Sequence, residues 1–226
     1  MIFNKYHESS SWPPVSHPYT PKTPGTNTRY AASDRNIFLP FQRLENEISR
    51  TVLNRKTSKT IIKGSRVNLD TLGTFLKWSA GVTEDGRRMY PSAGALYPND
   101  IFVVIKQVDK VRSGLYRYVA SEHALTWINE HNEIENAFVQ TDIDCNFCLI
   151  IAADLQYAGK HYGERGYRFC LLEAGHIVQN MMLVAQAQEL AIAPVGGFKD
   201  DEINVKMIPE RFLAVYLVPV GRYDLK

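Results

Sequence analysis

The spacing of apolar residues predicts two helices in the first half of the chain. From Phe41 onward, apolar residues recur every three or four positions with charged residues between them: Leu44, Ile48, Val52 and Leu53. This spacing is that of an amphipathic helix. A second helix is predicted over residues 69–79, because Asn68 is a favourable N-cap and Gly81 a favourable end. Its buried face is expected to hold Leu72, Phe75, Leu76 and Trp78.

Runs of β-branched, aromatic and other apolar residues predict five strands, over residues 101–105, 114–118, 124–128, 147–153 and 213–220. Between the last two, residues 167–190 are apolar around most of a helical circumference and predict a long, central, buried helix. Glu173 interrupts this apolar surface, and we expect its carboxylate to bind a buried arginine or a backbone donor. A short helix is predicted over residues 199–206.

Two segments lack these patterns. Residues 157–168 are polar and aromatic, and we interpret them as a loop. Residues 1–40 carry closely spaced prolines, which rule out a regular helix or central strand. We expect residues 1–40 to form an extended arm, which either wraps a partner or is mobile, and residues 41–226 to form one domain.

The composition narrows the class of protein. The 226 residues are 45% hydrophobic and 22% charged, with a formal net charge of +2, which is typical of a globular domain. Without a block of like charges, nucleic acid is not an expected partner. No apolar run approaches the roughly 18 residues of a membrane span, and the N-terminus lacks the apolar middle of a signal peptide. We therefore expect a cytoplasmic protein.

Three cysteines are too few for a disulfide framework. Cys145 and Cys148 form a Cys-x-x-Cys motif, but no second pair is present to complete a zinc site. Cys148 falls in a predicted strand, where a buried thiol is the usual outcome. We expect no metal site.

Two stretches carry candidate chemistry. Residues 91–98 place small residues between two prolines just before a strand, so a flat ligand could lie against the main chain there. Residues 55–59 combine basic and hydroxyl side chains at a helix end, which suits a phosphate. Each also has a simple structural interpretation, as a turn and as a charged helix cap. The chain has neither a Gly-x-Gly-x-x-Gly nor a P-loop motif.

These two stretches, together with residues 162–177, 194–198 and 220–222, resemble the nitroreductase superfamily in order and spacing. Within it they are most similar to the SagB-type dehydrogenases, which include the FMN-dependent azoline oxidases of thiazole/oxazole peptide biosynthesis. The resemblance implies an α+β fold with a mixed β-sheet flanked by helices. It also implies an obligate homodimer with FMN at the interface.

The resemblance also implies the residues that bind FMN. The phosphate and ribityl chain would be held by Arg55, Lys56, Thr57, Lys59 and Arg222. A loop reaching the flavin from the other subunit would comprise Pro91, Ser92, Ala93, Gly94 and Ala95. Backbone N–H groups along the isoalloxazine would come from Val195, Gly196 and Gly197.

The implied catalytic residue is Tyr162, with His161 or Lys160 as its basic partner. Many azoline oxidases carry Lys-Tyr before the glycine, whereas this chain carries His161-Tyr162 with Lys160 one residue earlier. Aromatising an azoline transfers a hydride to the flavin and a proton to a base. A tyrosine is a poor base at neutral pH unless a nearby cation lowers its pKa, so either basic residue could assist.

The function implied is therefore oxidation of thiazoline or oxazoline rings in a peptide, with reoxidation by O₂ and a cyclodehydratase complex as a partner. Two alternatives stay open. One is an NAD(P)H-dependent flavin reductase of the same fold that acts on nitro, quinone or dehydroamino acid substrates. The other is a non-catalytic subunit of a biosynthetic complex.

Overall fold

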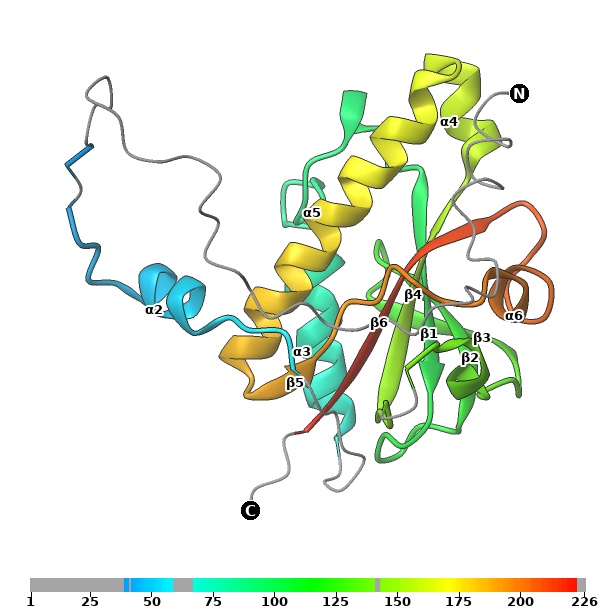
Figure 1. The fold of residues 1–226 in the computed structure, drawn as a ribbon, viewed down its shortest axis with the longest axis horizontal. Helices are drawn as coiled ribbons and strands as arrows, with labels where there is room; N and C mark the ends of the chain where they lie inside the picture. The colour runs from blue at the N-terminus through cyan, green and yellow to red at the C-terminus, as the bar shows by residue number, and fades with distance from the viewer. Residues whose placement is uncertain (1–38, 41, 59–66, 141–142, 223–226) are drawn as a thin grey trace, which may run out of the picture.

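The computed structural model of the chain describes residues 39–40, 42–58, 67–140 and 143–222 (Figure 1). The predicted arm over residues 1–40 lies almost entirely outside the described residues, as does Lys59. The helices are α2 (Glu47–Asn54), α3 (Leu69–Ala80), α4 (Leu155–Tyr162), α5 (Arg165–Ala187) and α6 (Asp200–Asn204), with 3₁₀ turns η1 (Ala93–Ala95) and η2 (Ile134–Ala137). In this part of the chain no helix is long and apolar enough to cross a membrane.

Six strands form one sheet in the order β3-β2-β1-β4-β6-β5. Their bounds are β1 (Asn99–Ile105), β2 (Gly114–Val119), β3 (Ala124–Asn129), β4 (Phe147–Ala153), β5 (Leu190–Ile192) and β6 (Leu213–Arg222). The five predicted strands are all present, and β5 is an addition. All neighbouring strands pair antiparallel, so the expectation of a mixed sheet is wrong for the described residues. Hairpins join β1, β2 and β3, and antiparallel pairing continues through β4 and β6.

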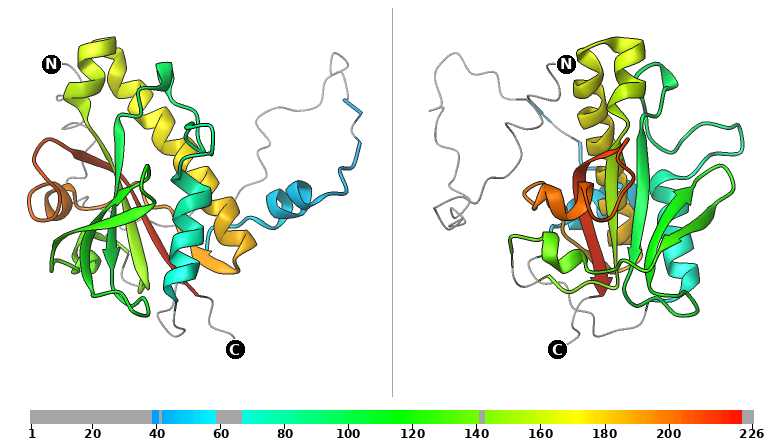
Figure 2. Two further views of the ribbon diagram at one scale, coloured as in Figure 1. Left: turned by 180° about the vertical axis from the view of Figure 1, so that it is seen from behind. Right: turned by 90° about the vertical axis from the view of Figure 1, so that its right-hand side faces the viewer.

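Both faces of the sheet are covered (Figure 2). Alternate residues of β1 point to opposite sides: Val103 packs with α3 and α5, whereas Val104 packs with η2 and α6. A strand that is buried on both faces needs apolar residues at every position. This burial explains why residues 101–105 and 147–153 are continuous apolar runs.

Helix α3 begins and ends where its sequence predicts. Asn68 Oδ1 accepts a hydrogen bond from Thr71 N (2.8 Å), and Gly81 is the C-cap. Leu72 and Phe75 lie in the core, but Trp78 is 61% exposed, so its predicted burial is wrong in the single chain. The 23-residue helix α5 buries one face, whereas Leu172 and His176 lie exposed on the other.

The segment interpreted as a loop, residues 157–168, is in fact helical: it spans most of α4 and the start of α5. Asp154 Oδ1 caps α4 by accepting from Tyr157 N (2.9 Å), and Asp154 also forms an ion pair with Arg211. Gly163, with a φ of 58°, ends the helix. The segment contains glycines and is polar, so its sequence does not show the apolar pattern of a helix. The start of α4 depends instead on the Asp154 cap and on tertiary contacts.

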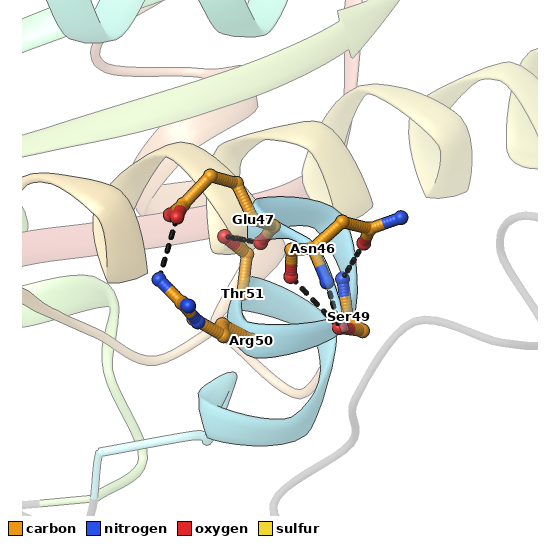
Figure 3. A network of polar contacts seen from close by, with 5 residues as sticks. All are labelled: Asn46, Glu47, Ser49, Arg50 and Thr51. Atoms are coloured by element: carbon orange, nitrogen blue, oxygen red, sulfur yellow. Dashed lines mark hydrogen bonds and ion pairs between the residues drawn. The ribbon is translucent and has the colours of Figure 1, made fainter. Parts of the chain in front are cut away.

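Helix α2 is shorter than predicted and begins with a capping box (Figure 3). Asn46 Oδ1 accepts from Ser49 N (2.9 Å), and Asn46 N donates to Ser49 Oγ (3.1 Å). Glu47 and Arg50 form an exposed ion pair in the same turn. The helix projects beside α5 and away from the sheet (Figure 1). Its apolar residues are exposed in the single chain: Ile48, Val52 and Leu53, together with the preceding Leu44.

Candidate functional site

The Tyr162 side chain meets the small-residue loop that precedes β1. A Cβ atom placed on Gly94 would overlap the Tyr162 hydroxyl, so only glycine fits beneath it. Gly94 has a φ of 57°, which also favours glycine. The Tyr162 ring packs edge-on against Phe169 of α5, with ring centroids 4.9 Å apart. We call the cluster of Tyr162, Phe169 and residues 92–97 the tyrosine corner.

The loop of the tyrosine corner has an unusual backbone. Ala95 and Tyr97 also have positive φ angles, 54° and 51°, which are uncommon for residues other than glycine. Tyr97 N donates to Ser92 Oγ (2.9 Å), and this bond closes the loop on itself. Pro91, Ala93, Gly94 and Ala95 remain exposed or half-buried. Such strained, accessible backbone is typical of a ligand-binding loop.

A buried carboxyl group lies behind this loop. Glu173 of α5 is 2% exposed, and its Oε1 accepts from Asn99 N (3.2 Å) and Asn99 Nδ2 (3.0 Å). The expectation that Glu173 binds a backbone donor is thus confirmed. Burial raises the pKa of Glu173, whereas the Ser92 hydroxyl and the Asn99 donors act in the opposite direction. Its partner Asn99 carried no signal in the sequence beyond its place before a strand.

His161 and Lys160 lie in the last turn of α4, and both are exposed. His161 Nδ1 lies 3.0 Å from the backbone oxygen of Tyr157, and the two rings are in edge contact. A carbonyl oxygen only accepts, so Nδ1 is the donor of this hydrogen bond. The structure therefore brings Tyr162 to the loop, but it directs the His161 ring toward its own helix.

The predicted phosphate residues gather at the opposite end of the sheet. Arg55 is the C-cap residue of α2, and its Nη1 atom lies 3.9 Å from Met182 Sδ. Lys56 and Thr57 follow and are exposed. Ser58 then joins β5: Ser58 N donates to Ile192 O (2.8 Å), and Ile192 N donates to Ser58 Oγ (3.0 Å).

Arg222 reaches the same edge from the end of β6, where it pairs with Leu190 of β5. Its Nε is buried and, within the described residues, has no hydrogen-bond partner. Buried polar groups are rarely left unsatisfied, and a guanidinium favours a phosphate partner. We call Arg55, Lys56, Thr57 and Arg222 the basic edge. Its donor set fits the phosphate of a nucleotide cofactor.

Val195, Gly196 and Gly197 continue from β5 along β6. Val195 and Leu217 exchange two backbone hydrogen bonds (2.7 and 3.0 Å), which fixes the start of this segment. Gly196 is exposed, and a Cβ atom there would find no neighbour closer than 3.9 Å. Val195 is buried and Gly197 half-buried, so the exposed backbone of this segment is at Gly196.

The two halves of the predicted site lie at opposite ends of the molecule (Figures 1 and 2). At the tyrosine corner, Leu213 begins β6 and packs against α4 and α5. Arg222 ends the same strand at the basic edge. Nine residue steps separate them, about 30 Å at the usual rise of a strand. An FMN molecule is shorter than that distance, so one chain does not bring both ends to one flavin.

The chain thus combines an antiparallel α+β sheet with exposed loop backbone and a cationic edge. The sequence pattern described as "Nitroreductase family" matches residues 52–222, so the chain belongs to that family. Membership of this family indicates that the chain is an oxidoreductase, and proteins of the family typically bind flavin.

Two curated relatives and one solved structure sharpen the comparison. The protein MJ1384 of Methanocaldococcus jannaschii, whose name assigns it to the nitroreductases, is 33% identical over 178 residues, which are 76% of this chain and 89% of that protein. The microcin B17-processing protein McbC of Escherichia coli is 29% identical over 143 residues, 58% of this chain and 53% of McbC. The E. coli microcin synthetase McbBCD complex with truncated pro-MccB17 bound superposes with a TM-score of 0.77 at 20% identity, covering 99% of this chain and 92% of that one. The last likeness shows the shared fold.

Proposed function

We propose that this chain is an FMN-dependent dehydrogenase that oxidises thiazoline or oxazoline rings of a peptide to azoles. The observation that carries the proposal is the contact between the Tyr162 hydroxyl and Gly94. It joins the proposed proton acceptor to the loop that the family resemblance assigns to the flavin. The similarity to McbC, a microcin-processing protein, supports a peptide substrate.

The residues of the basic edge would hold the cofactor. Arg222 and Arg55 supply charge-assisted hydrogen bonds to the phosphate, and Lys56 and Thr57 add donors beside them. Lys59, outside the described residues, is proposed for the same role. Val195, Gly196 and Gly197 offer backbone N–H groups to the ring system, and residues 91–95 cover it from the other copy. Bound FMN supplies the acceptor for a hydride from the azoline ring CH₂.

The chain's own task in the reaction is then to remove a proton. In the oxidation, the ring carbon beside the carbonyl loses a proton as the ring CH₂ loses its hydride. Tyr162 is the proposed acceptor of this proton; its hydroxyl lies against Gly94 and its ring packs on Phe169. Lys160 or His161, in the same helical turn, supplies the positive charge that makes a phenol a better base. O₂ is the proposed final electron acceptor.

A homodimer is proposed because one chain does not complete the site and leaves a large apolar surface exposed. Leu53 is 76% exposed and Trp78 61%. A groove of about 570 Å³ lies between α2, α3 and α5, lined by Trp78, Leu183 and Val184 among others. A second copy that covered this surface would bury it and could bring its tyrosine corner toward the basic edge.

One alternative has a specific observation in its favour. The 33% identity to MJ1384 fits a nitroreductase that draws hydride from NAD(P)H. The two functions share the cofactor and the fold, but they differ in the reductant. A subunit that lacks flavin and only scaffolds a complex is the third possibility, and it predicts a colourless protein.

Anaerobic reduction of the purified protein separates these functions. We expect stoichiometric FMN, rapid bleaching of the flavin by a thiazoline peptide, and slow bleaching by NADPH. Tyr162→Phe is the control, because it should keep the flavin but slow the bleaching. Fast bleaching by NADPH with none by the peptide would support the reductase instead.

A further inference from the structure

We propose that Glu173 is a positioning residue: its buried carboxyl group fastens the 91–98 loop to α5 through Asn99 and so holds Gly94 against Tyr162. The consequence for catalysis rests on the proposed function. The mechanical role of Glu173 does not, because it follows from contacts within one chain.

Asn99 is the first residue of β1 and directly follows the loop. It is tied to α5 at two points one helical turn apart: Glu173 Oε1 accepts from its N and Nδ2, and the Cys170 carbonyl accepts from the same Nδ2 (3.0 Å). Glu173 and Asn99 are 2% and 5% exposed. The end of the loop is therefore fixed inside the core, where water does not compete for these bonds.

The loop needs such an anchor because its backbone adopts an energetically unfavourable conformation. Gly94, Ala95 and Tyr97 all have positive φ angles within four residues. Residues other than glycine rarely adopt this region, so the surrounding structure must impose it. Ser92 Oγ holds the middle of the loop through Tyr97 N, and the Ser92 hydroxyl also faces Glu173. The carboxyl group is hydrogen-bonded where the strained stretch ends, through Asn99.

Hydrogen bonding, and not an ion pair, accounts for the role of Glu173. The nearest cation is Arg88, whose guanidinium lies over the Tyr97 ring, 5.6 Å from its centroid, and no ion pair joins it to Glu173 in the part of the chain that is described. The other titratable groups that face the carboxyl are Tyr90 and Cys170. Glu173 thus serves as the hydrogen-bond acceptor for two donors of Asn99, its backbone N and its Nδ2.

Amide hydrogen exchange tests the anchor in the whole purified protein. In Glu173→Ala we expect the amides of Tyr97 and Asn99 to exchange about tenfold faster, since the loss of a hydrogen bond shifts the local opening equilibrium by up to about that factor. The amides of β4 should be unchanged. Glu173→Gln keeps an acceptor oxygen and should restore wild-type exchange. Glu202→Ala is the matched control, because it also removes a glutamate: Glu202 lies on α6 and forms an exposed ion pair with Lys206.

A second readout connects the anchor with the reaction. In Glu173→Ala, single-turnover flavin reduction at saturating FMN should fall about tenfold. FMN affinity should fall less than in Arg222→Ala, because the proposed phosphate contacts of the basic edge lie at the other end of β6. Should Glu173→Ala fail to fold, Glu173→Met retains the volume without an acceptor and replaces it.

Three results would overturn the inference: wild-type exchange at Tyr97 and Asn99, acceleration spread evenly over β4, or equal loss in Glu173→Gln. A wild-type protein that binds no flavin would instead refute the proposed function. The exchange data would still decide the role of Glu173.

Discussion

The basic edge and the tyrosine corner differ in how they are built. At the basic edge, cations stand at the ends of α2 and β6, and the buried Nε of Arg222 lacks a hydrogen-bond partner in the described residues. At the tyrosine corner, the hydroxyl of Tyr162 lies on Gly94, its ring packs on Phe169, and Glu173 is hydrogen-bonded behind the loop. The first region is a set of cationic side chains at the ends of two elements, whereas the second is held by packing and hydrogen bonds within the chain.

This difference indicates a division of labour. Charge-assisted contacts to a phosphate would supply affinity, which is the role proposed for the basic edge. Proton transfer requires a group within hydrogen-bond reach of the reacting atom, so the tyrosine corner requires a fixed one. Substitutions at the basic edge should therefore change FMN affinity, whereas substitutions at the tyrosine corner should change the rate of flavin reduction.

The largest effect is expected at the tyrosine corner. Tyr162→Phe should reduce the rate of flavin reduction by an azoline about 10²–10⁴-fold, the usual contribution of a general base. FMN content and the free energy of unfolding should change little, because the ring still packs on Phe169. Stopped-flow reduction under anaerobic conditions measures the rate. A wild-type rate in the variant would remove Tyr162 from the mechanism.

The second largest effect, a loss of FMN affinity, is expected at the basic edge. Arg222→Ala would remove the proposed charge-assisted hydrogen bond to the phosphate, about 1.5–3 kcal/mol, so FMN affinity should fall roughly 10–100-fold. At saturating FMN, the rate of reduction should return to the wild-type value. Titration of apoprotein with FMN gives the affinity. Full flavin occupancy of the variant at limiting FMN would show that Arg222 does not bind the phosphate.

His161→Ala should have a smaller effect, about tenfold or less, because its ring hydrogen-bonds to the Tyr157 carbonyl on its own helix. His161→Lys restores the pair common in azoline oxidases and should retain activity, with the pH profile of the rate moved upward. Steady-state rates across pH measure both. A loss in His161→Ala as large as in Tyr162→Phe would make the imidazole the base.

The smallest expected effect is the pH dependence of stability at Glu173. Burial raises the pKa of this group above its ordinary value of 4.5 in the folded state. The stability it contributes is therefore complete below pH 4.5 and is lost as the pH rises through the folded-state pKa. Burial also raises the pKa of Tyr90, and raises that of Cys170 to about 12, so neither titrates in this window.

Glu173→Gln should remove this dependence. Denaturation with urea at several pH values, comparing the variant with the wild type, measures it. The variant should gain stability relative to the wild type as the pH rises toward neutral. The opposite slope would mean that the carboxylate form is favoured in the fold.

The sequence predicted those elements whose apolar pattern and caps are local. β1 and β4 follow from continuous apolar runs, and α3 follows from Asn68 and Gly81. Helix α4 escaped prediction, because its cap, Asp154, is held by Arg211 from a distant segment. Antiparallel order is likewise a property of pairing between strands, which the pattern along one strand does not encode.

The candidate site was predicted only in part, for a similar reason. The resemblance identified the two loops and Tyr162, but nothing in the sequence showed that the Tyr162 hydroxyl lies on Gly94. Asn99 looked like an ordinary strand residue, although it ties the loop to Glu173. Trp78 was expected to be buried, but it is exposed in the single chain, as are the apolar residues of α2. The pattern along the chain does not encode which apolar side chains pack within one copy.

The length of β6 has a genetic consequence. If each active site of a dimer combines the tyrosine corner of one copy with the basic edge of the other, then two differently damaged chains can rescue one another. Co-expression of Tyr162→Phe with Arg222→Ala should give mixed dimers in which one site carries both defects and the other carries neither. Two defective alleles would thus restore part of the activity together, because each mixed dimer keeps one intact site.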